Sequence, residues 1–97
     1  GVMLLSGDRH HTELLRVARP DGYPLYELTC SPLTSGPHDI SGERDKPSLV
    51  PGTLVGERNF CSMRFEGAHD QRRVVLRSFN AAGKELWRHE IKASELR

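Results

Sequence analysis

The sequence has no long hydrophobic run, and this absence excludes a membrane-spanning helix. The opening apolar run, Val2–Leu5, is far shorter than the roughly 18 apolar residues that a transmembrane helix needs. It also lacks the basic flank that precedes the apolar core of a signal peptide. We therefore expect no membrane partner for this chain.

An excess of charge of one sign is also missing. Lys and Arg total 14 residues against 13 for Asp and Glu, so the formal net charge is +1 with the five histidines neutral. The basic residues are scattered among acidic ones, and the pair Arg72-Arg73 follows Asp70 closely. Because nucleic-acid binding requires clustered positive charge, the sequence predicts no nucleic-acid partner.

Cysteine is scarce, and its spacing does not suit a metal site. Cys30 and Cys61 are the two cysteines, and each lies within an apolar strand-like pattern. Free cysteine is among the residues most often buried, so we expect two buried free thiols. The alternative is a disulfide, which requires that the strands carrying them be neighbours.

The length of 97 residues allows one small domain or a piece of a larger one. At 36% hydrophobic residues the chain buries a modest core. Its second residue already begins a buried-type strand, with no preceding turn. We therefore expect residues 1–97 to be a fragment of a longer domain.

Strand patterns occupy the first third of the chain. Val2–Leu5, ended by Ser-Gly, predicts a central strand covered on both faces. Thr12–Arg19 fits a strand or one turn of helix, and Pro20-Asp21-Gly22 favours the strand because it forms a turn. Leu25–Cys30 alternates apolar and polar residues, so the two segments predict a β-hairpin.

The middle of the chain has a different character. Pro and Gly recur between Ser31 and Arg58, and the polar run SGERDKPS lies among them. Such a composition sustains neither a helix nor a strand for long. We predict a long irregular loop over residues 35–58.

The last third predicts a three-stranded antiparallel meander over Phe60–Phe65, Arg72–Phe79 and Lys84–Lys92. A hairpin loop, Asn80–Gly83, ends in glycine, where a positive φ is needed. The tail, Ala93–Arg97, is expected to fray or to form a short helical turn. The sequence as a whole therefore predicts a mainly β fold with mostly antiparallel strands.

Candidate chemistry is concentrated at Gly7–His11, directly after the first predicted strand. Asp offers an oxygen ligand and His a nitrogen ligand, a combination suited to Zn, Mn or Fe. On an extended chain Asp8 and His10 project to the same side, and His11 points away unless the loop curls. Two ligands do not complete a metal site. The remaining histidines, His38, His69 and His89, are expected in surface or satisfied structural roles.

Two motifs resemble a known family. LLSGDRHHTEL followed by YPLYELTCSPLT resembles the C-terminal segment of the alkaline phosphatase D (PhoD-like) family of metallophosphoesterases. Asn59-Phe60 at the start of a strand and GKELW in the final meander extend the resemblance over nearly the whole chain. It implies that residues 1–97 are the C-terminal part of a metallophosphoesterase domain, a partial piece of its layered α/β sandwich.

The resemblance implies a role for each residue of the motif. His10 is implied as a ligand of a divalent or ferric ion (Zn, Mn, Fe or Ca), and Asp8 as a second ligand or as the group that orients one. Asp8, Arg9 and His11 are implied as catalytic residues that act on the phosphate ester. Arg9 either faces the substrate phosphate or forms a structural salt bridge, and Asn59 is a further candidate contact. Exported members of the family suggest a periplasmic or extracellular location.

The family's other metal-binding motifs do not occur in these 97 residues, so we expect the chain to be inactive alone. It would contribute its Gly-Asp-Arg-His motif to phosphate ester hydrolysis by a full-length enzyme. The alternative is a non-catalytic β-rich binding or structural module. An uncovered Val2–Leu5 strand would expose an apolar edge, so the isolated chain is also expected to self-associate.

Overall fold

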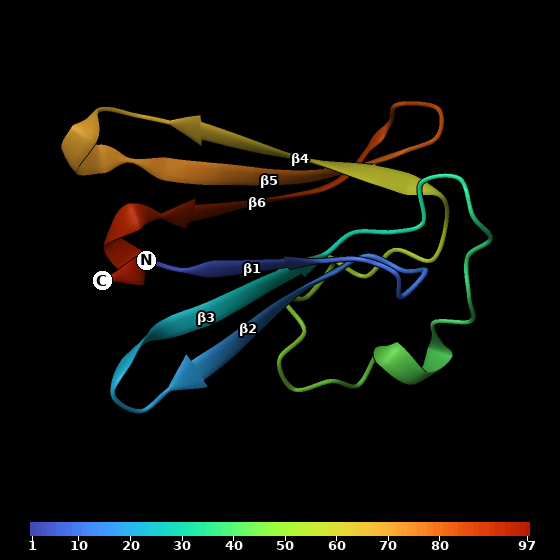
Figure 1. The fold of residues 1–97 in the computed structure, drawn as a ribbon, viewed down its shortest axis with the longest axis horizontal. Helices are drawn as coiled ribbons and strands as arrows, with labels where there is room; N and C mark the ends of the chain where they lie inside the picture. The colour runs from blue at the N-terminus through green and yellow to red at the C-terminus, as the bar shows by residue number, and fades with distance from the viewer.

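Two three-stranded β-sheets pack against each other in the computed structural model, which describes all residues 1–97 (Figure 1). The first sheet contains β1 (Met3–Ser6), β2 (Glu13–Arg19) and β3 (Gly22–Thr29), and the second contains β4 (Asn59–Glu66), β5 (Arg73–Asn80) and β6 (Glu85–Lys92). The helices are the short 3-10 segments η1 (Ser41–Glu43), η2 (His69–Gln71) and η3 (Ala93–Leu96), none long enough to cross a membrane. The predicted mainly β fold is confirmed.

The predicted hairpin is present as β2 and β3, which pair in antiparallel register with Leu14 opposite Leu28. Along β3 the side chains of Tyr26 and Leu28 are buried, and Glu27 between them is less buried. This alternation follows from the pleat of a strand with one face on the core.

The central, doubly covered position predicted for the first strand is not present within this chain. β1 pairs in parallel with β3 and lies at the edge of its sheet, in the order β1-β3-β2. Leu4 and Leu5 are 44% and 63% exposed, so β1 is not covered on both faces within this chain. A short apolar run does not reveal its own position in a sheet, because coverage depends on neighbours elsewhere in the fold. The expected apolar edge is present, and self-association stays a prediction.

The C-terminal meander is confirmed, with β5 between β4 and β6. Val74 and Leu76 on β5 are buried on the inner face, with Trp87 and Ile91 beside them on β6. Gly83 closes the β5–β6 hairpin with a φ of 84°, as its turn position requires. The tail forms η3, in agreement with the predicted helical turn.

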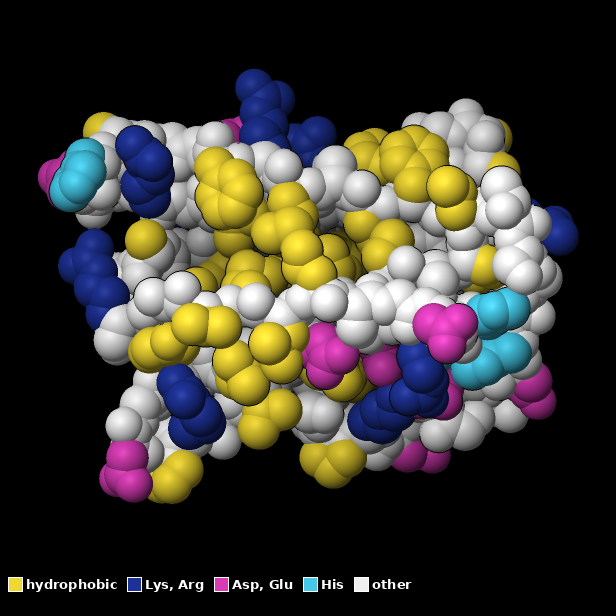
Figure 2. Space-filling view, viewed as in Figure 1, with side chains coloured by type: hydrophobic (Ala, Val, Ile, Leu, Met, Phe, Trp, Pro, Cys, Tyr) yellow, Lys and Arg dark blue, Asp and Glu magenta, His cyan; other side chains and the backbone are white.

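The core lies between the sheets and draws on both. It consists of eight buried side chains: Leu14, Tyr26, Leu28, Val55, Val74, Leu76, Trp87 and Ile91. A hollow of about 330 Å³ opens between β1 and the second sheet, lined mainly by apolar side chains that include Met3, Leu5, Met63 and Phe65. Figure 2 shows hydrophobic side chains gathered in this hollow.

The two cysteines are paired, so the expectation of free thiols is wrong. Cys30 follows β3 and Cys61 lies in β4, and their disulfide joins the two sheets across 31 positions of sequence. Each cysteine does lie beside apolar residues, but the end of β3 and the beginning of β4 are close enough in the fold for the two sulfur atoms to bond. This disulfide joins the two ends of the chain segment that contains the irregular loop.

The predicted irregular loop over residues 35–58 contains η1 and no strand. It covers the outer edge of β2 through isolated bridges from Thr12 to Val55 and from Leu15 to Leu49. The Leu14 amide also donates to Thr53 Oγ1 at 3.1 Å. The loop therefore satisfies backbone groups that an open strand edge would leave unpaired.

Candidate functional site

The loop after β1 curls, and this curl decides where its reactive side chains lie. Asp8 and His10 have positive φ values of 66° and 60°. Asp and His are among the non-glycine residues most often found in this left-handed region. The extended conformation from which Asp8 and His10 were expected to project together is therefore absent, and His11 turns into the protein.

His10 is half-buried and tied to the loop over residues 35–58. Its Nδ1 lies 2.7 Å from the Gly36 carbonyl oxygen, and its own carbonyl accepts a hydrogen bond from the His38 amide at 3.3 Å. A carbonyl at Nδ1 selects the tautomer that is protonated there, which leaves Nε2 with a free lone pair. Metal-bound histidines typically have this arrangement. The surroundings of His10 thus fit the ligand role that the family resemblance implies.

Asp8 and Arg9 lie on the exposed side of the curl. No side chain donates a hydrogen bond to Asp8 in the structure, so its carboxylate is free toward solvent. Arg9 is 55% exposed, and its Nη2 donates to Glu43 Oε1 at 3.0 Å. The salt bridge considered for Arg9 is therefore formed, although the other N–H groups of the guanidinium have no protein acceptor.

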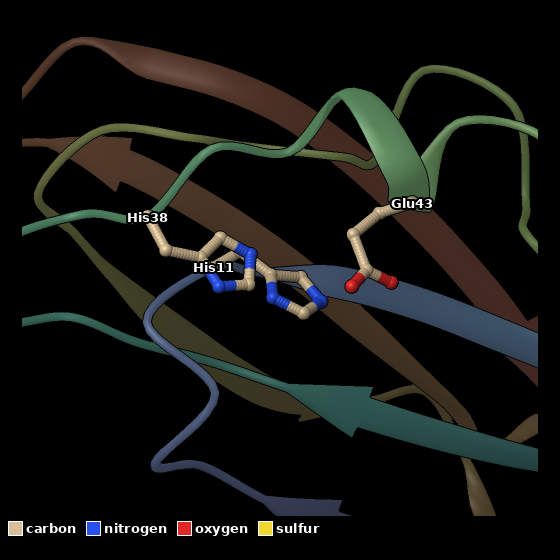
Figure 3. A group of neighbouring side chains, drawn as sticks. All are labelled: His11, His38 and Glu43. Carbon is tan, nitrogen blue, oxygen red and sulfur yellow. The ribbon is translucent and has the colours of Figure 1, made fainter.

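His11 is fully buried and stacks on His38, with ring centroids 4.8 Å apart and planes inclined by 23°. Glu43, from η1, directs its carboxylate toward the same ring, so His11 lies between His38 and Glu43 (Figure 3). One ligand atom from each of the three residues lies within 4.8 Å of the other two. We call these three residues the His11 cluster.

A charged pair adjoins the His11 cluster. Glu13, at the start of β2, is only 2% exposed and accepts a hydrogen bond at 2.6 Å from Lys46 Nζ. Lys46 also pairs with Glu43, so one ammonium group bridges two carboxylates.

The pKa shifts around this bridge favour the charged forms. The hydrogen bond from Lys46 lowers the pKa of Glu43. Burial by itself would lower the pKa of Lys46, but its hydrogen bonds to Glu13 and Glu43 outweigh that effect and raise it. The carboxylate of Glu43 therefore stays ionised well below neutral pH.

Asn59 occupies a structural position beside the loop. Its side chain is buried, accepts from Thr12 Oγ1 at 2.7 Å and Ser78 Oγ at 3.1 Å, and donates to the Ser31 and Glu57 carbonyls. All of its hydrogen-bonding capacity is thus used within the protein. This arrangement leaves Asn59 no direct contact with a substrate.

The residues of the Gly7–His11 motif lie in two different environments. His10, Asp8 and Arg9 lie at or near the surface, whereas His11 joins a cluster with His38 and Glu43 that sequence reasoning missed. His38 was expected to be exposed or satisfied, yet it is half-buried and its Nε2 has no hydrogen-bond partner. His69, by contrast, is exposed on η2 as expected.

Only one sequence signal could have found the partners of His11. The loop over residues 35–58 carries one histidine and several acidic residues, and it follows the motif in the chain. Its irregular backbone offers no periodicity from which to place them. Comparison with known proteins finds no family model, no curated protein and no solved structure that matches the chain.

Proposed function

We propose that this chain is the C-terminal part of a metal-dependent phosphoric ester hydrolase and that its Gly7–His11 loop supplies a metal ligand. The observation that carries the proposal is the setting of His10. Its Nδ1 is held by the Gly36 carbonyl at 2.7 Å, and its Nε2 is left free near the surface. The left-handed conformation of two non-glycine residues in one loop adds weight, because such backbone strain is concentrated at functional sites.

Each residue of the loop has a part in this proposal. His10 would hold the ion through Nε2, with Asp8 as a second ligand or as an acceptor that orients one. A divalent or ferric ion supplies Lewis-acid stabilisation of the charge that develops on the phosphoryl oxygens. Arg9, anchored to Glu43 through one nitrogen, has further N–H groups to bind a phosphate oxygen. His11 is buried, so it would act by positioning the loop.

The remaining ligands must come from outside residues 1–97, so the chain by itself should not hydrolyse phosphate esters. The Cys30–Cys61 disulfide supports an oxidising compartment, in line with a periplasmic or extracellular enzyme.

The test is the rate of p-nitrophenyl phosphate hydrolysis by the full-length protein of which this chain would be the C-terminal part. Loss of a group that merely orients a ligand costs about 10–100-fold, so removal of a ligand in His10→Ala should lower activity by at least about 100-fold. His69→Ala, which removes an exposed histidine, is the matched control and should leave the rate unchanged. Wild-type activity in the His10→Ala enzyme would refute the ligand assignment.

A second candidate function is a non-catalytic binding module. The structure of the core favours this alternative. All eight core side chains come from residues 14–91, so the two sheets pack together without any contribution from the Gly7–His11 loop. On this alternative the full-length protein would lack phosphatase and phosphodiesterase activity with each of the proposed metals. Hydrolysis that depends on His10 would exclude it.

A further inference from the structure

Beneath the surface formed by Asp8, Arg9 and His10, the strongest unexplained feature is the His11 cluster. Two imidazoles and one carboxylate lie close together there (Figure 3). His11 precedes β2, and His38 and Glu43 both belong to the irregular loop, Glu43 within its helix η1. His10 does not belong to this group.

The cluster contains polar atoms that the protein itself does not satisfy. The Nε2 atoms of His11 and His38 are both buried without a hydrogen bond. His11 Nε2 lies 3.2 Å from Glu13 Oε1, but in an orientation that makes no hydrogen bond. Buried polar groups are nearly always satisfied, and each exception requires a reason such as an ion. Two unpaired nitrogens beside a carboxylate indicate a cation as the missing partner.

The charges of the region show that a cation is already accommodated beside the cluster. Lys46 directs its ammonium group to Glu13 and Glu43, and Arg9 directs its guanidinium to the other oxygen of Glu43. These ammonium contacts are made by a half-buried, flexible side chain that can withdraw to solvent. Once it withdraws, the two carboxylates would favour a divalent ion in its place.

We propose that His11, His38 and Glu43 form a Zn²⁺ site of their own, distinct from the ligand role of His10. Two histidine nitrogens, one carboxylate oxygen and an open fourth position make up a ligand set that tetrahedral zinc accepts. With metal–ligand bonds of about 2.0 Å, ligand atoms must come within about 3.3 Å of one another, closer than the 4.8 Å they span here. His38 and η1 lie in the irregular loop and supply this movement, while His11, two residues before β2, is held in place by its full burial.

The experiment is calorimetric titration of the 97-residue chain with Zn²⁺, supported by the visible absorption of Co²⁺ as a reporter of tetrahedral coordination. We expect one ion per chain and a rise in thermal midpoint on binding, since the ion binds only the folded state. His38→Ala and Glu43→Gln should each weaken binding by at least tenfold, because loss of a ligand exceeds the loss of a group that orients one. Both side chains lie in the loop, and far-UV circular dichroism verifies that the sheets remain.

Two further variants separate this site from its neighbours. His10→Ala should bind Zn²⁺ as the wild type does. Lys46→Met should bind about tenfold more tightly, because the ion then no longer has to displace the ammonium group from the carboxylate of Glu43. Four results would each overturn the proposal. Two are a failure of the wild type to bind Zn²⁺ and binding by His38→Ala as tight as that of the wild type. The other two are loss of binding in His10→Ala and unchanged affinity in Lys46→Met. None of these results bears on the activity test of His10 in the full-length protein.

Discussion

The C-terminal meander and the corner around the Gly7–His11 loop are stabilised by opposite means. On the inner face of the meander the buried side chains are mostly apolar, as with Val74, Leu76 and Ile91. In the corner many of the fully or almost fully buried side chains are polar or charged, and we call this group the polar corner: His11, Thr12, Glu13, Thr53 and Asn59. The two regions share one small core and a single disulfide.

This contrast implies different responses to substitution. Apolar burial is roughly proportional to the area removed from water, so a truncation in the meander loses a graded amount of free energy. Removal of one member of a buried polar network leaves its partners unpaired, and each unpaired group retains the full cost of its desolvation. A corner built in this way is also better suited to hold an ion or a strained loop than an apolar sheet is.

The largest effect should come from Asn59→Ala, which removes the centre of the polar corner. It leaves the Ser78 hydroxyl and the Ser31 and Glu57 carbonyls with fewer partners. We expect the free energy of unfolding to fall by about 4 kcal/mol, at about 1–3 kcal/mol for each unsatisfied group. Urea denaturation monitored by tryptophan fluorescence measures this change.

Val74→Ala provides the matched truncation in the meander, at a residue that is 5% exposed. It should cost about 2 kcal/mol, because the loss consists of two buried methyl groups and a small cavity. If Asn59→Ala proved the milder of the two, the contrast between the regions would be wrong.

The disulfide should have the next largest effect, since it connects the two regions. Cys30→Ser combined with Cys61→Ser removes a cross-link over 31 positions of sequence. The unfolded chain then gains conformational freedom, and the free energy of unfolding should fall by about 3 kcal/mol. Denaturation of the wild type in the presence of a thiol reductant is the control and should reproduce the loss. Identical stability of oxidised and reduced protein would contradict a role for this link.

The regular sheets could be predicted from the sequence, whereas the features that depend on the irregular loop could not. Strand-like patterns bounded by turn residues mark Leu25–Cys30 and Arg72–Phe79, so the hairpin and the meander were predicted correctly, although Val75 is buried on the face of β5 opposite to Val74 and Leu76. Strand position and cysteine pairing were not, because the edge position of β1 and the Cys30–Cys61 disulfide depend on how the chain returns through an irregular loop.

The candidate site was predictable in its location and not in its geometry. The residue types at Gly7–His11 single out this loop as a candidate metal site, and its metal-binding role stays a prediction. Which of them point outward was decided by left-handed conformations at Asp8 and His10, and these belong to the tertiary structure rather than to a residue pattern. The partners of His11 come from the loop, where no periodicity fixes a side-chain direction.

The smallest effect concerns His89, a titratable side chain on the inner face of the meander that provides a contrast to Lys46 in the polar corner. His89 is half-buried in β6, and its ring lies 6.0 Å from that of Tyr26. Burial lowers the pKa of His89 below its usual 6.5, and the charge of Glu95 offsets this only in part.

Between the lowered folded-state pKa of His89 and 6.5, the unfolded chain therefore binds more protons than the folded protein does. Stability should rise with pH across this window, and acidification from pH 7 through it should weaken the fold by less than any of the three changes above. His89→Gln removes this contribution, so the difference in unfolding free energy between variant and wild type should shift with pH in that window alone. His69→Gln, on the exposed helix η2, controls for the loss of one histidine. If the unfolding free energies of His89→Gln and the wild type changed with pH in the same way, burial would not disfavour the charged form of His89. The apolar face would then accommodate an imidazolium as the polar corner accommodates the ammonium group of Lys46.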